Sequence, residues 1–341
     1  MSVLAGHQPV VWVWWSDGRA DAQRFYLHPY FDPSMLFRSL RGAHFSLALL
    51  LIATGLVGCD YKDGVVERSV VIRADADLGD VLIGNRGRTL YVFANEPDGT
   101  PACLGPCLDT WPVYFVEELI LDPRLDPADF DEITRPDGLS QITYKGWPLY
   151  NFSPDGNGQV ESPRSVLGDG VGGVWFAAKP DYGVLVARKQ LVGADGNNYL
   201  EDGTLGDAVS RFLTDPAGIT LYRFTGDANA TNNFTAPDFS NDGIWPLYFE
   251  AGAVPSAYDQ ADFGVIDVFG RQQLTFKGWP LYTFFADEVR GDTKGISQPT
   301  PGTFVTVNNG TETAPASIVG GGADSGSSGS EGGYGGYGDT P

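Results

Sequence analysis

The sequence is built on an internal duplication. The hexapeptide Lys-Gly-Trp-Pro-Leu-Tyr stands at 145–150 and again at 277–282, an offset of 132 residues. The tripeptide Ala-Asp-Phe at 128–130 returns at 261–263, so the register is kept well outside the hexapeptide. A repeat maintained over such a length predicts two related structural units, one in each half of the chain.

A shorter unit, Tyr-x-Phe-x-x-acid, repeats inside each half. Its four copies are Tyr91/Phe93/Glu96, Tyr150/Phe152/Asp155, Tyr222/Phe224/Asp227 and Tyr282/Phe284/Asp287. Residues two apart in a strand share a face, so each Tyr and Phe are predicted to lie on one strand and point together into a core. The acid falls in the turn that follows, where a carboxylate can accept backbone N–H bonds.

The composition favours strands and turns over long helices. The 341 residues include 45 Gly and 23 Pro, and 13% are aromatic. We therefore predict an all-β (β-rich) fold of two tandem related halves built from short antiparallel strands, followed by a disordered Gly/Ser-rich C-terminal tail. The predicted boundaries are 78–181 for half 1, 182–204 for a linker, 205–307 for half 2 and 308–341 for the tail.

An export signal precedes the duplication. Arg38 and Arg41 form a basic segment, and an apolar run at 45–57 leads to Gly58 and Cys59. The run is too short to span a bilayer comfortably. The order of these parts resembles a bacterial lipobox, which implies cleavage before Cys59 and lipidation of its thiol. An uncleaved anchor or a chance cysteine is the alternative.

Three further boundaries follow from this signal. Met35 is well placed as a start, so 1–34 is expected to be a misassigned N-terminal extension. Residues 35–58 then form the lipoprotein signal peptide, and 59–77 form a tether. The predicted location is the cell envelope, extracytoplasmic and lipid-anchored, with inner and outer membranes both open.

The same cleavage removes much of the chemistry available to the chain. All three His and both Met lie before Cys59. The mature chain would therefore lack a histidine general base, a Ser-His-Asp triad and histidine ligands for zinc, copper or haem iron. A net charge of −21 also disfavours nucleic acid. We accordingly predict no enzyme, no catalytic residue and no nucleic-acid partner.

Cys103 and Cys107 are the two thiols that remain after Cys59. They stand four apart around a Gly-Pro turn, and outside the cytoplasm such a pair predicts a small disulfide. A redox-active bridge and a metal site are the two alternatives.

Together, these motifs resemble the predicted bacterial lipoprotein family of secreted repeats of unknown function, which carries a Tyr-x-aromatic-x-x-Asp motif. The resemblance covers about 78–181 and 205–307 and implies an envelope or secreted lipoprotein without an established reaction. Half 2 departs from the pattern. It has 235–241 in place of the cysteine pair, and 304–307 in place of a Val-Trp-Phe segment.

The motif residues admit more than one role. The aromatic residues, including Trp111, Trp147, Trp245 and Trp279, are expected to build the core, with an exposed platform for sugars or quinone-like rings as the alternative. The motif acids are expected to hold turns. Calcium or another hard cation is the second interpretation and a glycosidase-like carboxylate pair the third. No cofactor is predicted, with calcium left open.

Taken together, the sequence favours a lipid-anchored cell-envelope protein that acts as a non-enzymatic binding or structural module. Its expected partners are the membrane, through the lipid on Cys59, and an envelope protein or glycan. The alternative function is an accessory role in extracytoplasmic redox or hard-cation handling, for which Cys103 and Cys107 are the candidate redox group.

Overall fold

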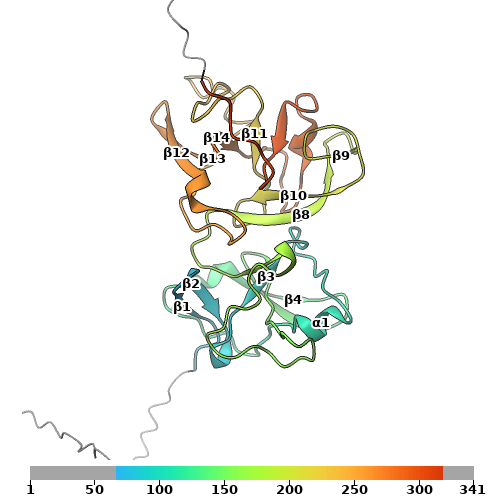
Figure 1. The fold of residues 1–341 in the computed structure, drawn as a ribbon. Coiled ribbons are helices and arrows are strands. Elements are labelled where there is room, and N and C mark those ends of the chain that lie inside the picture. Colours follow the sequence, from blue (N-terminus) through green and yellow to red (C-terminus); the bar gives the residue numbers. More distant parts are fainter. Residues whose placement is uncertain (1–66, 318–341) are drawn as a thin grey trace, which may run out of the picture. The chain divides into compact units, whose positions relative to one another are not determined.

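The structure is a computed structural model that describes residues 67–317 (Figure 1). It is β-rich, with many short antiparallel strands, which confirms the predicted fold class. The predicted N-terminal extension, the signal peptide, Cys59, the start of the tether and the tail beyond residue 317 lie outside the described residues. Between residues 67 and 317, no helix has the length and apolar character needed to cross a membrane.

In the first half, β1 pairs with β2, β3 pairs with β7, and β5 lies between β4 and β6 and pairs with both. The strands are β1 (Val71–Asp75), β2 (Gly79–Ile83), β3 (Tyr91–Phe93), β4 (Phe130–Thr134), β5 (Ser140–Tyr144), β6 (Trp147–Pro148) and β7 (Trp175–Ala177). The helical elements are α1 (Cys107–Thr110) and single 3-10 turns at Asn85–Gly87, Pro127–Asp129 and Val171–Gly173. A bridge between Tyr91 and Tyr150 joins the β3–β7 pair to the remaining sheet.

The second half repeats this order with strands β8 (Leu185–Val192), β9 (Asn198–Tyr199), β10 (Val209–Thr214), β11 (Tyr222–Phe224), β12 (Phe263–Val268), β13 (Arg271–Phe276), β14 (Trp279–Tyr282) and β15 (Phe304–Thr306). Its 3-10 turns are Gln260–Asp262 and Lys294–Ser297. The β8–β10 pair corresponds to β1–β2, and β12-β13-β14-β11-β15 forms one continuous sheet. The duplication read from the sequence is thus a duplication of strand order.

The repeated Lys-Gly dipeptide forms the turn of a β-hairpin in each half. Lys145 has φ 47° and Gly146 φ 76°, while Lys277 has φ 48° and Gly278 φ 82°. Positive φ at both central positions is typical of the type I′ turn, whose twist matches that of the flanking strands. A Cβ atom at position 146 would also lie 1.9 Å from the Arg290 guanidinium, so glycine is required there twice over.

Aromatic rings fill the interior with the same geometry in both halves. Trp111 stacks on Trp175 with ring centroids 3.7 Å apart, and Trp245 stacks on Phe304 at 3.5 Å. Phe304 therefore takes the place of Trp175, a correspondence that the sequence of 304–307 hides. Stacked and edge-on aromatic pairs stabilise such a core beyond the area they bury.

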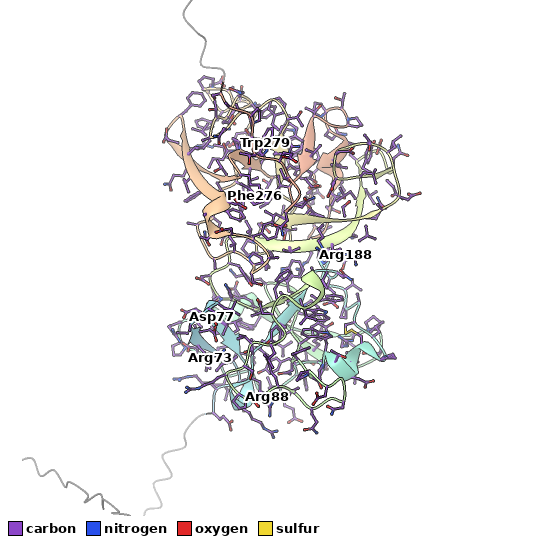
Figure 2. All side chains as sticks on the ribbon, viewed as in Figure 1. Arg73, Asp77, Arg88, Arg188, Phe276 and Trp279 are labelled. Atoms are coloured by element: carbon purple, nitrogen blue, oxygen red, sulfur yellow. A yellow bond between two sulfur atoms is a disulfide. The ribbon has the colours of Figure 1, made fainter. Side chains whose placement is uncertain are left out.

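The motif aromatics belong to this interior. All twelve are buried except Phe224, which is partly buried, and Trp147 and Trp279 are exposed by only 1% and 7%. Figure 2 shows Trp279 and Phe276 among the strands of the second half. The interpretation of these residues as an exposed aromatic platform is therefore wrong.

The prediction that Tyr282 and Phe284 share a strand is wrong. Strand β14 ends at Tyr282, so Phe284 lies two residues beyond it. The reason is that the backbone turns to another partner, because the Thr283 N–H donates to the Pro246 carbonyl at 3.1 Å. Phe284 is still buried, and its ring centroid lies 4.6 Å from that of Trp245. The predicted burial of Phe284 in the core is therefore confirmed. Its position results from contacts of this segment with Trp245 and Pro246 and not from a strand.

Phe152 departs from the predicted strand in the same way. It follows β6 outside any strand, and the neighbouring Asn151 N–H donates to the Pro112 carbonyl at 2.8 Å. The Phe152 ring is buried with its centroid 4.6 Å from that of Trp111. The first copy of the motif in each half, on β3 and β11, does keep its Tyr and Phe on one strand.

The two halves share part of their core. One apolar cluster includes residues from both, among them Leu149 and Leu281. The Trp147 indole N–H donates to the carbonyl of Pro216 at 3.0 Å, and Arg290 Nε donates to the carbonyl of Pro97 at 2.9 Å. The Arg290 guanidinium also lies over the Trp147 ring, 4.9 Å from its centroid. These contacts tie the hairpin of half 1 to segments of half 2.

Two predicted boundaries are wrong because strands were missed. The predicted linker 182–204 contains β8 and β9, and the predicted tether contains β1. Val186 of β8 packs in the shared core while Leu191 packs in the core of half 2. A strand covered on both faces does not show simple polar–apolar alternation, so its sequence lacked the usual signal.

The predicted start of the disordered tail at residue 308 is also wrong. Residues 308–317 lie against the hairpin of the second half, and Ala314 is buried. The Trp279 indole N–H donates to the carbonyl of Glu312 at 2.8 Å, and Lys277 Nζ donates to the carbonyl of Asn309 at 2.8 Å. Side chains of the repeated hairpin thus hold this segment by hydrogen bonds to its carbonyl groups. A hydrophobic pattern does not reveal such bonds, so the sequence did not predict that the segment is ordered.

Candidate functional site

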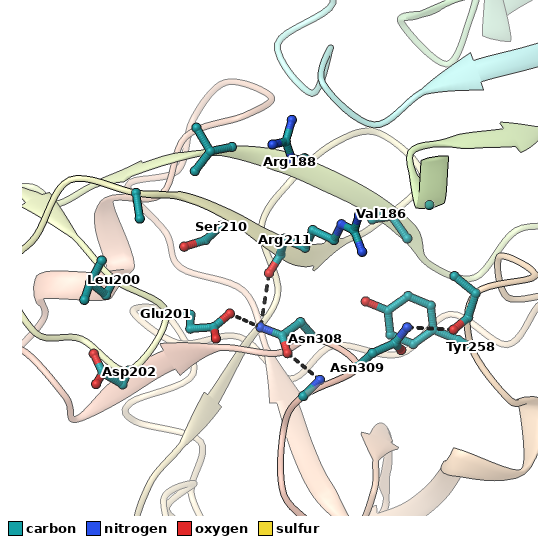
Figure 3. Close-up of a pocket in the computed structure, with 15 residues that line it drawn as sticks. Val186, Arg188, Leu200, Glu201, Asp202, Ser210, Arg211, Tyr258, Asn308 and Asn309 are labelled. Atoms are coloured by element: carbon teal, nitrogen blue, oxygen red, sulfur yellow. Dashed lines mark hydrogen bonds between the residues drawn. The ribbon is translucent and has the colours of Figure 1, made fainter. Parts of the chain in front are cut away.

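A cleft of about 640 Å³ lies beside the β8–β10 pair (Figure 3). Polar side chains along it include Arg188, Glu201, Asp202, Ser210, Arg211 and Asn308. None of the site residues predicted from the sequence lines this cleft. Arg188, Glu201 and Asp202 lie within 182–204, the segment that was predicted to be a linker. Arg188 stands on strand β8, and a basic residue in a strand of so acidic a chain was the signal that sequence reasoning missed.

The motif tyrosines and acids lie elsewhere, paired inside each half. Each half has two motif tyrosines, and each tyrosine hydroxyl donates to a carboxylate from the loop that comes after the other tyrosine in the sequence. The four pairs are Tyr91–Glu161 at 2.5 Å, Tyr150–Glu96 at 2.8 Å, Tyr222–Asp287 at 2.7 Å and Tyr282–Asp227 at 2.8 Å. The two Tyr-x-Phe units of one half are therefore linked reciprocally.

Each of these carboxylates also closes a loop onto the backbone. The acid accepts a hydrogen bond from an N–H group six or seven residues further along the chain. The donors are Ala102 for Glu96, Leu167 for Glu161, Asn233 for Asp227 and Lys294 for Asp287, at 2.7–2.9 Å. Glu96, Asp227 and Asp287 hold loops, as the sequence predicted, and Glu161 does so without having been predicted. All four acids also bond the tyrosines.

Glycine allows two of the tyrosines to reach their loops. Gly168 N–H donates to the Tyr91 hydroxyl at 3.3 Å, and Gly295 N–H donates to the Tyr222 hydroxyl at 3.2 Å. A Cβ at either glycine would approach the phenol ring to less than 3 Å. A larger residue at these positions would push the ring away from its carboxylate.

Asp155 is the one motif acid that takes no part in this arrangement. It is exposed in a turn, and Glu161, buried with 3% exposure, occupies the equivalent place. The prediction of Asp155 as the fourth equivalent acid is thus wrong. The motif spacing gave no signal for Glu161, which follows Phe152 by nine residues, whereas the other three acids follow their Phe by three.

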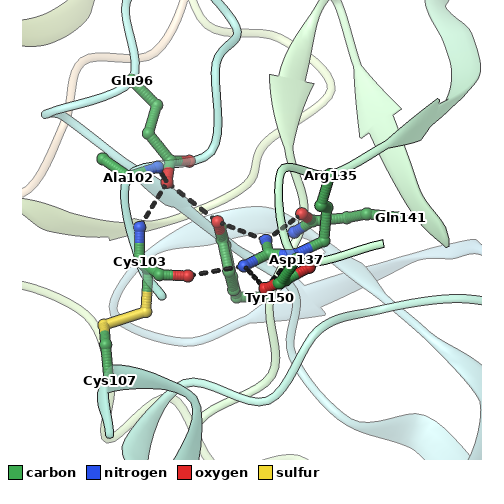
Figure 4. The surroundings of a disulfide bond; sticks show 8 residues. All are labelled: Glu96, Ala102, Cys103, Cys107, Arg135, Asp137, Gln141 and Tyr150. Carbon is green, nitrogen blue, oxygen red and sulfur yellow. Dashed lines mark hydrogen bonds and ion pairs between the residues drawn. A yellow bond between two sulfur atoms is a disulfide. The ribbon is translucent and has the colours of Figure 1, made fainter. Parts of the chain in front are cut away.

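The predicted disulfide between Cys103 and Cys107 is present (Figure 4). The N–H of Cys103 donates to Glu96 at 3.2 Å, and its carbonyl accepts from Arg135 at 2.5 Å. Arg135 is buried, bonds the Tyr150 hydroxyl at 3.0 Å and pairs with Asp137 at 3.0 Å. The disulfide loop is therefore anchored to the Tyr150–Glu96 pair.

Asparagine side chains hold the corresponding loop of the second half. Asn232 Oδ1 accepts from the N–H groups of Phe234 and Thr235 at 3.0 and 2.7 Å. Asn241 donates to the carbonyl of Phe234 at 2.7 Å. Hydrogen bonds thus replace the covalent link that half 2 lacks.

A family model described as a secreted repeat of unknown function matches residues 72–114, 132–179 and 265–297. These three matches agree with the resemblance that the sequence motifs indicate. Each matched segment includes one of the buried acids, Glu96, Glu161 or Asp287. No curated protein and no solved structure matches the chain. The description of the repeat as secreted points to a location outside the cytoplasm.

Burial alters the acidity of the carboxylates that bond the tyrosines. It raises the pKa of Glu96 to about 7 and those of Asp227 and Asp287 to about 6. Burial also raises the pKa of Glu161. The Glu96 Oε2 atom is buried without a hydrogen-bond partner, whereas Oε1 accepts three bonds. This arrangement suits a carboxyl group that binds a proton near neutral pH.

The raised pKa values predict that the folded chain loses stability as pH rises from 5 to 8. The folded state binds more protons than the unfolded state between the two pKa values of each acid, so unfolding becomes easier as these protons leave. Glu96→Gln keeps an acceptor without the charge and should gain up to about 3 kcal/mol at pH 8 and little at pH 4. Urea denaturation across this pH range measures the difference.

Glu132→Gln, on exposed strand β4, provides the matched control and should leave the pH dependence of stability unchanged. Acids with a lowered pKa do not contribute to the change of stability between pH 5 and 8. Hydrogen bonding to Arg124 lowers the pKa of Asp122, and hydrogen bonding to Arg135 lowers that of Asp137. Their contributions are complete by pH 5. A Glu96→Gln variant with the wild-type slope between pH 5 and 8 would contradict the assignment.

The disulfide between Cys103 and Cys107 is expected to stabilise the first half by closing a short loop. Replacing Cys103 and Cys107 together by Ala should lower the free energy of unfolding by about 2 kcal/mol, because a short closed loop restricts the unfolded chain. Urea denaturation with and without reductant tests this. Reductant should weaken the native chain and leave the double variant unchanged, and equal stability of the two proteins would argue against this stabilisation.

The calcium interpretation of the motif acids stays a prediction. Within residues 67–317, no group of three or more His, Cys, Asp or Glu side chains is arranged to hold a metal ion. Four buried acids in the repeats are instead occupied by tyrosine hydroxyls and backbone N–H groups. Calorimetry with calcium, and melting with and without chelator, measure binding directly.

Proposed function

We propose that this secreted-repeat protein is a lipid-anchored, non-enzymatic binding module of the cell envelope. The observation that carries the proposal is the internal use of the motif groups. Four tyrosine hydroxyls and four carboxylates bond one another inside the halves. The conspicuous polar residues of the repeat thus serve the scaffold, and the cleft beside β8–β10 offers polar groups for a ligand.

The chemistry of the chain supports binding rather than catalysis. The buried tyrosines have raised pKa values because burial disfavours the phenolate. In the cleft, Glu201 bonds the side chain of Asn308, and Asp202 accepts from the N–H and hydroxyl of Thr204 at 2.9 and 2.6 Å. These contacts position both acids as hydrogen-bonding groups of a fixed surface.

Lipid attachment at Cys59 is tested by metabolic labelling with an alkyne analogue of palmitate. The native chain should take up the label and sediment with membranes, because an acylated N-terminus partitions into lipid. Cys59→Ala should lose both properties. Label retained by that variant, or a native chain free of label, would contradict the anchor.

Binding without turnover is tested with the full-length chain and cell-envelope glycan fractions. Glycans should be retained on the immobilised protein and be recovered chemically unchanged, as judged by chromatography before and after incubation. New products that increase with protein concentration would show an enzyme. Failure to retain any fraction would contradict the binding role for glycans.

A further inference from the structure

Two of the residues that line the cleft are arginines on neighbouring strands. In the β8–β10 register Arg188 lies directly opposite Arg211, so the two side chains leave the same face of the strand pair. Like charges in this relation destabilise a sheet unless another group compensates them. Arg188 bonds the Asn95 side-chain oxygen at 3.4 Å, and Arg211 bonds the Gly172 carbonyl at 3.3 Å.

Neither of those contacts neutralises charge. Among residues 67–317, the ion pairs within 4.0 Å do not include Arg188 or Arg211. Glu201 and Asp202 also line the cleft, and their oxygens are bonded to Asn308 and Thr204 (Figure 3). A chain with net charge −21 therefore leaves two adjacent guanidinium groups without a bonded carboxylate.

The remaining groups of the cleft suit hydroxyl-rich ligands. The two carboxylates and the Asn309 side-chain oxygen line the cleft and can accept hydrogen bonds from hydroxyl groups. The volume of about 640 Å³ lies within the range of small-molecule sites. Glu201 and Asp202 can accept hydrogen bonds from sugar hydroxyls, which inorganic phosphate does not offer in an extended array.

From these contacts we infer that the cleft binds an acidic oligosaccharide, with the carboxylate of one sugar on the Arg188–Arg211 pair. Planar guanidinium groups bind carboxylates through paired, charge-assisted hydrogen bonds. The ligand would remove the repulsion between the two arginines, and its hydroxyls would donate to Glu201 and Asp202, which also line the cleft. The inference rests on the proposed binding role and names the ligand class.

Isothermal titration of the full-length chain tests the inference with three probes: trigalacturonate, neutral maltotriose and inorganic phosphate. Trigalacturonate should bind, and its affinity should fall with added salt because the contact is ionic. Arg188→Gln and Arg211→Gln should each weaken it by about tenfold or more. Arg86→Gln, an exposed change outside the cleft, should leave the affinity unchanged.

Three results would overturn the inference: no binding of trigalacturonate, undiminished binding by both cleft variants, or equally tight binding of maltotriose or phosphate. Melting of the unliganded variants separates loss of contact from loss of fold. Removing one of two opposed charges should leave the melting temperature unchanged or raise it, and a marked fall would assign the arginines a structural role instead. Retention of other envelope glycans without trigalacturonate binding would reject this ligand class and leave the proposed function standing.

Discussion

Glu161→Ala is expected to lower the free energy of unfolding by about 3 kcal/mol, whereas Asp155→Ala should change it by less than about 0.5 kcal/mol. Removing Glu161 leaves the Tyr91 hydroxyl and the Leu167 N–H without their acceptor in a buried site. Asp155 is exposed. Urea denaturation of both variants measures the contrast between the acid that the motif names and the acid that the fold uses.

These two substitutions control for each other, because both remove one carboxylate from the same half. Similar losses of stability would show that the exposed turn matters as much as the buried pair. A larger loss for Asp155→Ala would restore the simple Tyr-x-Phe-x-x-acid motif as the structural unit.

Trp147→Ala should destabilise the chain by about 3–5 kcal/mol, because a fully buried tryptophan leaves a large cavity. The substitution also removes the hydrogen bond to the Pro216 carbonyl and the surface on which Arg290 lies. Both contacts join the two halves, so the loss should appear as lower cooperativity of unfolding as well as a lower midpoint. Thermal and urea denaturation followed by circular dichroism measure both quantities.

Phe285→Ala gives the matched aromatic control. Its side chain is 59% exposed, and its loss should cost less than about 1 kcal/mol. If Trp147→Ala were equally mild, the indole could not be part of the shared core.

The duplication and the aromatic interior were predictable because their signals are local and repeated. The hexapeptide carries its own turn, Lys145-Gly146, and begins a strand at Trp147 and again at Trp279. Burial of the motif rings follows from the small size of each half and the large area of each side chain. The disulfide likewise followed from two thiols four residues apart.

The point at which each strand ends was less predictable than the burial of its rings. The alternation of Tyr282 and Phe284 indicated one strand, yet β14 stops at Tyr282 and Phe284 packs from the segment beyond it. The alternation of apolar residues indicates which side chains are buried. It does not record that the next backbone N–H bonds the Trp-Pro segment instead of the sheet.

The partners of the polar groups were not predictable in the same way. Glu161 stands nine residues after Phe152, and its bond to Tyr91 spans 70 residues. Such a contact depends on how two repeats face each other, which the spacing within one repeat does not encode. Strand β8 was missed for a related reason, because neighbours on both faces decide its burial.

A double-mutant cycle of Tyr91→Phe with Glu161→Ala tests most directly whether the repeats of one half are linked through buried tyrosine–carboxylate pairs. The coupling energy from urea denaturation should be about 1–3 kcal/mol, because the two groups lose the same hydrogen bond. The parallel cycle of Tyr91→Phe with Asp155→Ala should give no coupling beyond about 0.5 kcal/mol. Additive effects in the first cycle, or comparable coupling in the second, would contradict the reciprocal pairing.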